Sequence, residues 1–314
     1  MPAGTRHHRT RHFIRETFRL FPSLLLILLL SSPAPARRQD DDDVVRVESD
    51  LVILNVTVTD AQGRFIRKLR RTDFQVFEDG REQTINSFLV EETPFAAAIL
   101  LDTSSSMERR ISLARAAAIR FLDGLRGDDV TALYNFNDEV ERMQDYSPSR
   151  DLPALAYDLK TKGKTSLNDA ILLAAKDLAA RPEKRRAIVI LSDGIDFGSR
   201  ASSDKALNAA LNAGASIYAV NMIDKVAHPV LQMQAGAALK NFATKSGGRY
   251  VATPGGFELG EAFVGIAEEL RNQYTISYRP SNGARDGRWR EIDLKVSRTD
   301  ASARTRKGYR APKK

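Results

Sequence analysis

The stretch Phe95–Met107, which reads FAAAILLDTSSSM, decides the fold. Its first seven residues are apolar, and Asp102 and a cluster of hydroxyl side chains follow them at once. A continuous apolar run is typical of a strand that is buried on both faces of a parallel sheet. Such sheets carry their binding groups outside the carboxyl ends of the strands. We therefore expect a binding site directly after this strand, with oxygen atoms as its ligands.

Strands and helices alternate along the middle of the chain, which is typical of an α/β domain. The expected elements together predict a doubly wound, mostly parallel sheet. We predict strands over 95–101, 130–136, 187–192, 215–220 and 250–251, an antiparallel edge strand over 139–146, and helices over 111–125, 152–159, 167–180, 203–213, 232–245 and 257–271.

Shorter, alternating strand patterns occupy residues 44–92 and 273–314, on either side of the α/β domain. Neither segment alone has the roughly seven strands that are usual for a closed sandwich of this kind. We therefore predict that the two segments pack into one β-sandwich, into which the α/β domain is inserted. The alternative is that each segment extends the α/β sheet independently.

The N-terminus has the layout of a secretory signal peptide. A basic region precedes the apolar core at residues 24–30, and an Ala-x-Ala pattern ends at Ala36. An uncleaved anchor is the alternative, but the eleven residues 20–30 are shorter than the ~20 that span a bilayer. We expect cleavage after residue 36, a charged linker over 37–43, and export to the periplasm or beyond, with no membrane span left after cleavage.

Composition excludes several classes of function. The chain has no cysteine, which rules out disulfides, thiolate metal sites and cysteine nucleophiles. Its net charge is +8, of which residues 1–36 contribute +4, and acids are interspersed in the rest, so nucleic acid is not an expected partner. Three of the four histidines also lie in residues 1–36, which leaves His228 as the only candidate base of a Ser-His-Asp triad. The chain has no Gly-x-Ser-x-Gly turn, the sequence that carries the nucleophilic serine in many hydrolases, so a hydrolase of this kind is disfavoured.

Two further segments bring oxygen-bearing side chains to strand ends or loops. Thr165 follows Gly163 in a loop that leads into a helix, and Asp193 follows a second apolar run. Each signal is weak alone, because hydroxyl clusters often cap helices and an Asp-Gly pair is often a turn. Carboxylate and hydroxyl oxygens without sulfur or imidazole select Mg²⁺, Ca²⁺ or Mn²⁺ rather than zinc or copper.

The spacing Asp102-x-Ser104-x-Ser106, together with Thr165 and Asp193 in this order, resembles the metal-ion-dependent adhesion site of the von Willebrand factor A domain. The resemblance implies that Ser104 and Ser106 bind the ion directly and that Thr165 does so in the high-affinity state. It implies direct or water-mediated binding by the two aspartates. It also implies a coordination position that is left open for an acidic residue, Asp or Glu, of a partner protein.

The chain as a whole resembles the VWFA-related domain family, which is described mainly from acidobacteria. Such proteins are secreted, so the resemblance also implies export. The segments that carry it, besides the adhesion site, are Thr72–Phe74, Glu78–Gly80, Glu269–Tyr274, Tyr278–Pro280 and Arg306–Tyr309. The predicted domains are a signal peptide (1–36), a linker (37–43), an N-terminal β segment (44–92), the A domain (93–272), and C-terminal strands with a basic tail (273–314).

From these features we expect an exported protein-binding module that depends on a divalent cation, with Mg²⁺ as the first candidate ion. An enzyme is not expected, because two aspartates and hydroxyls offer no free general base. The alternatives are a structural interaction protein whose metal only stiffens the loops, a metal-dependent hydrolase, and an accessory subunit like the A domains that serve beside some AAA-type ATPases. The partner, the resident ion and the oligomeric state stay open.

Overall fold

The structure, a computed structural model, describes residues 51–90, 93–222, 229–252 and 256–313. The predicted signal peptide, the linker and residues 44–50 lie outside these ranges. Residues 48–314 form one compact unit. Within the described ranges, no helix has the length and apolar content needed to cross a membrane.

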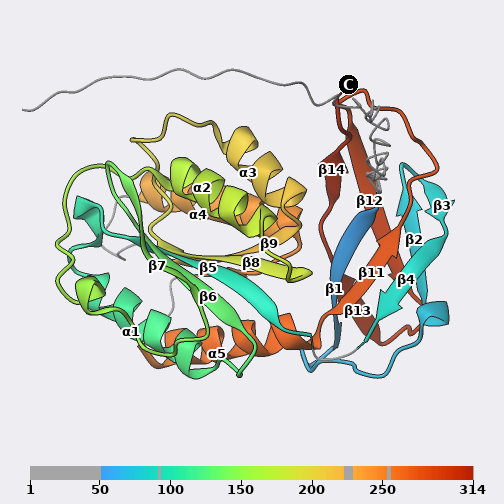
Figure 1. Cartoon of the computed structure of the whole chain (residues 1–314), viewed down its shortest axis with the longest axis horizontal. Helices are drawn as coiled ribbons and strands as arrows, with labels where there is room; N and C mark the ends of the chain where they lie inside the picture. The colour runs from blue at the N-terminus through green and yellow to red at the C-terminus, as the bar shows by residue number, and fades with distance from the viewer. Residues whose placement is uncertain (1–50, 91–92, 223–228, 253–255, 314) are drawn as a thin grey trace, which may run out of the picture. The chain divides into compact units, whose positions relative to one another are not determined.

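A six-stranded sheet forms the centre of the α/β part (Figure 1). Five of its strands run parallel, and β7 pairs with β6 in the antiparallel direction at one edge. This confirms the predicted mixed α/β fold with a largely parallel sheet. In spatial order the strands are β10 (Tyr250–Val251), β9 (Ala215–Asn221), β8 (Arg185–Ser192), β5 (Phe95–Asp102), β6 (Val130–Phe136) and β7 (Val140–Ser147).

Helices cover both faces of this sheet, and β5 shows why. Its side chains alternate, so that Ile99 and Leu101 join one apolar cluster and Ala98 and Leu100 join another, all with no exposed surface. The first cluster includes α1 (Ile111–Asp123) and α5 (Gly256–Asn272), and the second includes α2 (Leu167–Ala179), α3 (Ser203–Asn212) and α4 (Pro229–Ser246). Two-sided burial therefore explains the uninterrupted apolar run in the sequence.

The predicted helix over 152–159 is wrong. This segment forms one 3-10 turn, η3 (Ala154–Ala156), next to Pro153. Leu152 and Ala156 pack into the core at a helical spacing, but Leu155 is 62% exposed. An eight-residue segment cannot offset the cost of helix nucleation when so few of its side chains are buried.

The remaining strands form two four-stranded sheets that combine both ends of the described chain. Strand β1 pairs with β11, and β2 pairs with β12. One apolar cluster contains side chains of both sheets, among them Leu54, Val76 and Ile276, which have no exposed surface. The first sheet has the order β13 (Ala301–Arg304), β1 (Val52–Asp60), β11 (Tyr274–Tyr278) and β4 (Ile85–Leu89), and the second has the order β14 (Gly308–Arg310), β12 (Trp289–Val296), β2 (Phe74–Glu78) and β3 (Arg81–Gln83).

A buried carboxylate joins α5 to these sheets. Glu269 is 2% exposed, and its Oε1 accepts hydrogen bonds from the Thr57 hydroxyl at 3.1 Å, the Tyr218 hydroxyl at 2.8 Å and Arg304 Nη2 at 2.6 Å. These donors come from β1, β9 and β13. Because a buried carboxylate is costly unless it is paired and hydrogen-bonded, this network holds the two parts of the unit together in one arrangement.

Candidate functional site

The first loop of the candidate site follows β5. Asp102 is the last residue of that strand and has no exposed surface. Its Oδ1 accepts the Ser104 backbone N–H at 2.8 Å, and its Oδ2 accepts the Ser192 hydroxyl at 2.6 Å. The hydroxyls of Ser104 and Ser106 lie 3.1 Å apart. Three of the predicted ligands are therefore held in one hydrogen-bonded group by the turn that ends the strand.

The second loop is tied to the first by its backbone. The carbonyl of Gly163 accepts the Ser105 N–H at 3.2 Å, and Gly163 has a φ of +71°, where a Cβ atom would also collide with Asp138. Two residues later, Thr165 is 4% exposed. The positive φ favours glycine at position 163, and the threonine brings a hydroxyl oxygen to the same loop.

The third loop follows β8, the neighbour of β5 in the sheet. It is tied to the second loop, because the carbonyl of Thr165 accepts the N–H groups of Phe197 at 3.2 Å and Gly198 at 2.8 Å. Asp193 is 3% exposed, and its Oδ1 accepts the Ile195 N–H at 3.1 Å. The structure thus brings together the three loops that carry all five predicted residues.

The two aspartates are electrostatically coupled. Burial raises the pKa of Asp102 to about 7, and the charge of Asp193 acts in the same direction, while hydrogen bonds from Ser104 and Ser192 oppose this shift. Among the described residues, neither carboxylate forms an ion pair with a lysine or arginine. Two neighbouring buried carboxylates are costly when both are ionised, so a cation between them would be stabilised.

The donor set fits a hard divalent cation. It consists of two carboxylates and three hydroxyls, which are oxygen ligands of the kind that Mg²⁺, Ca²⁺ and Mn²⁺ take. Within the described ranges, this site included, no group of three or more His, Cys, Asp or Glu side chains could hold a metal ion. The candidate site is thus defined by hydroxyls as much as by acids.

Ion binding at this site is expected to depend on pH. With the pKa of Asp102 raised from 3.8 to about 7, the folded protein without a cation binds a proton more tightly than the unfolded chain does. Its stability should therefore fall as pH rises from about 4 to about 7. A cation must displace that proton below pH 7, so the apparent affinity for Mn²⁺ should fall about tenfold for each pH unit below about 7. Calorimetric titration with Mn²⁺ at pH 5.5, 6.5 and 7.5 measures this slope, and an affinity that does not change would contradict it.

Sequence reasoning missed the residues that position the ligands. Ser192 donates to Asp102 and accepts the Gly194 N–H at 2.9 Å, so it connects the first and third loops. Asp196 accepts the Asn168 N–H at 2.8 Å and therefore ties the third loop to the start of α2. The sequence could have indicated Ser192, because this serine is the one polar residue between the second apolar run and Asp193. Nothing in the sequence marks the long-range contact of Asp196.

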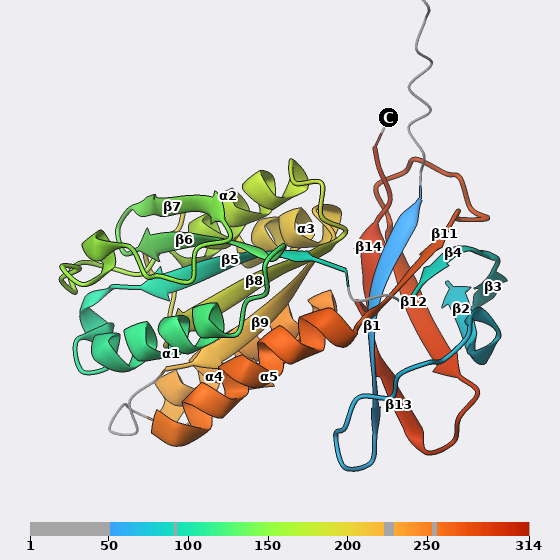
Figure 2. The same cartoon turned by 60° about the horizontal axis from the view of Figure 1, so that its bottom comes forward.

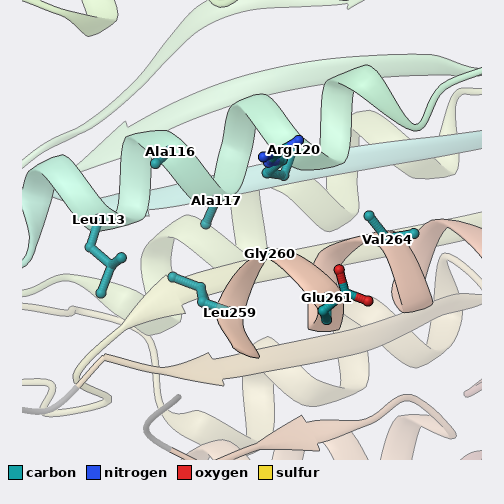
Figure 3. Close-up of a pocket in the computed structure, with 8 residues that line it drawn as sticks. All are labelled: Leu113, Ala116, Ala117, Arg120, Leu259, Gly260, Glu261 and Val264. Atoms are coloured by element: carbon teal, nitrogen blue, oxygen red, sulfur yellow. The ribbon is translucent and has the colours of Figure 1, made fainter. Parts of the chain in front are cut away.

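A separate pocket lies between α1 and α5 (Figure 3). It has a volume of about 310 Å³ and a mostly apolar wall, with Arg120 and Glu261 as its charged members. None of the five predicted ligands lines it. Its other lining residues are Leu113, Ala116, Ala117, Leu259, Gly260 and Val264.

Comparisons with known proteins agree with the fold. Residues 97–195 match the von Willebrand factor type A domain. A search of curated proteins finds no match to the chain.

Solved structures that match part of the chain include three bacterial proteins. An aerotolerance-related membrane protein from Bacteroides fragilis is 16% identical with a TM-score of 0.45, and the match covers 56% of this chain and 98% of that one. The vWF domain of the type V pili tip protein Mfa5 from Porphyromonas gingivalis is 14% identical with a TM-score of 0.47, and the match covers 57% and 95%. A von Willebrand factor type A protein from Catenulispora acidiphila is 12% identical with a TM-score of 0.47, and the match covers 85% and 75%.

The matched residues begin within β5 and end two residues after Asp193, so they include the first and second loops of the candidate site and the start of the third. The chain therefore contains a von Willebrand factor type A domain.

Proposed function

We propose that the protein is an exported protein-binding module whose A domain binds a partner through a divalent cation, with Mg²⁺ as the first candidate. Asp102, Ser104, Ser106, Thr165 and Asp193 would hold the ion. When bound, the ion would supply an open coordination position to an Asp or Glu side chain of the partner. The protein would act by binding and not as an enzyme.

The observation that carries this proposal is the pair of buried carboxylates with no cationic side chain beside them. Asp102 and Asp193 are 0% and 3% exposed, and each repels the ionised form of the other. A purely structural role would be served at lower cost by an uncharged pair, because buried charge without a counter-ion is unfavourable. A bound cation therefore gives the simplest physical reason for both acids.

We also infer that the two small sheets form the β-sandwich that the sequence predicts. Their shared apolar cluster and the pairing of β1 with β11 support this arrangement. Export rests on the signal-peptide pattern of residues 1–36, and membership of the VWFA-related family rests on the sequence resemblance.

The function can be tested by capture of a partner from cell-envelope fractions on the immobilised protein. We expect capture in 2 mM Mg²⁺ to be lost in EDTA and in the variant Thr165→Val. Valine keeps the branched shape of the buried side chain and removes only its hydroxyl, so the fold should persist while ion binding weakens about tenfold or more. Calorimetry with Mn²⁺ on the same variant measures that weakening directly.

Thr161→Val is the matched control, because it makes the same chemical change in the same loop outside the ligand set. It should leave both capture and Mn²⁺ binding unchanged. Partner capture that persists in EDTA, or the absence of any heat when Mn²⁺ is added to the wild-type protein, would overturn the proposal.

A further inference from the structure

Large apolar side chains are exposed on the loops around the candidate site. Phe197 is 72% exposed and Tyr157 is 56% exposed, although both are large aromatic residues. With Leu155, which is 62% exposed, they form a set that we call the apolar rim. Single exposed apolar side chains are ordinary on protein surfaces, but a set of them beside a binding site marks a contact surface.

A hydrogen bond places Phe197, one member of the apolar rim, next to a predicted ligand. The backbone N–H of Phe197 donates to the carbonyl of Thr165, so its exposed ring is anchored directly beside the second loop. The segment that carries Leu155 and Tyr157 continues to Leu159, whose carbonyl accepts Arg115 Nη2 at 2.7 Å from α1. In both views this connection from β7 to α2 runs along the end of the sheet to which β5 points (Figures 1 and 2).

Charged side chains of both signs accompany the apolar surface. Lys160, Lys162 and Lys164 are all exposed on the same connection, and Lys162 is held against the first loop by a 2.9 Å hydrogen bond from its backbone N–H to the carbonyl of Thr103. The acids Asp138, Glu139 and Asp158 are also exposed in this region, and Oδ1 of Asp138 accepts the backbone N–H of Lys164. The selection of an acid is therefore left to the cation, and the apolar rim favours a partner with apolar groups next to its acid.

We propose that the partner presents an acidic side chain flanked by aromatic or aliphatic residues, and that Phe197 contacts those flanking groups. This inference rests on the proposed function, since the cation would take the acid itself. The occupant is thus a protein segment with the pattern apolar-acid-apolar. An anchored aromatic ring gives a large contact area at low cost in side-chain entropy, as is typical of residues that dominate binding interfaces.

Three fluorescent heptapeptides test this in anisotropy titrations with 2 mM Mn²⁺ and with EDTA. Their central residues are Phe-Glu-Leu, Ser-Glu-Ser and Phe-Gln-Leu, and the other positions are Gly and Ala. The wild-type protein should bind the first peptide at least tenfold more tightly than the second, only with Mn²⁺, and should not bind the third. Phe197→Ser should remove the tenfold preference and leave Mn²⁺ affinity unchanged.

Val90→Ser is the control, since Val90 is an exposed apolar residue (44%) outside the apolar rim, and it should preserve the preference. Phe197→Ser and Val90→Ser are both surface changes that should alter the stability of the protein little. Equal, Mn²⁺-dependent binding of the two acidic peptides would overturn the role of the apolar rim and leave the proposed function intact. A preference that survives Phe197→Ser would also overturn it. If neither acidic peptide binds with Mn²⁺, the proposed function fails and this inference fails with it.

Discussion

Asp102→Asn is expected to stabilise the cation-free protein at pH 7.5 and to abolish its response to divalent ions. The asparagine removes a buried charge whose pKa is raised to about 7 by burial and by Asp193, so the unfavourable ionised pair disappears. Its side chain can still accept the Ser104 N–H and can donate to the Ser192 hydroxyl, so the loop keeps its hydrogen bonds. The change thus separates the electrostatics of the site from its geometry.

Thermal and urea unfolding with and without Mn²⁺ measure both effects. At a free Mn²⁺ concentration of 100 times its Kd, the wild-type protein should gain about 2.7 kcal/mol of stability. Asp102→Asn should gain almost nothing, because loss of a charged ligand weakens ion binding by at least about a hundredfold. Asp151→Asn makes the same change at an exposed site and should respond like the wild type. An unaltered Mn²⁺ response in Asp102→Asn would show that the ion, if it binds, binds elsewhere.

The fold of the α/β part could be predicted because its signals are local. Phe95–Leu101 and 187–191 are apolar runs long enough for buried strands, and each is followed by an acid at the point where the strand ends. Parallel pairing then brings those ends together without further information, as the register of Leu101 with Leu191 shows. Asp102 and Asp193 were therefore predictable from the order of elements, whereas Thr165 follows no strand and was predicted from the resemblance to the adhesion site.

Long-range polar contacts could not be predicted in the same way. Glu269 and Asp196 each bond to groups far away in the sequence, and no periodicity distinguishes them from acids on a solvent-exposed face. The helix predicted over 152–159 was wrong for a different reason. Leu152 and Ala156 do have a helical apolar spacing, but the segment is too short to form a helix. Patterns predict which faces are buried, while buried polar networks depend on the assembled structure.

Arg185→Met is expected to destabilise the protein by about 3–5 kcal/mol, because it leaves several buried carbonyls without donors. Arg185 begins β8 and has no exposed surface. Its guanidinium donates to the carbonyls of Arg271 at 2.7 Å and Gln273 at 2.5 Å, and it lies 3.5 Å from the carbonyl of Leu270. These carbonyls belong to the end of α5 and to the residue before β11, where a helix leaves its last acceptors without partners in the helix.

The cost of this change has two sources that a second variant separates. Methionine fills much of the arginine volume but leaves buried carbonyls without donors, each at about 1–3 kcal/mol, and removes a positive charge from the negative end of the helix. Arg185→Lys keeps the charge but has fewer donors in a different geometry. Its free energy of unfolding, measured with urea, should therefore lie between those of the wild type and Arg185→Met. Arg298→Met, which breaks an exposed 2.5 Å ion pair with Asp300, should cost far less, because water screens exposed charges. If Arg185→Met costs no more than Arg298→Met, the junction between α5 and β11 does not depend on this arginine, and the buried contacts of Glu269 would have to hold it instead.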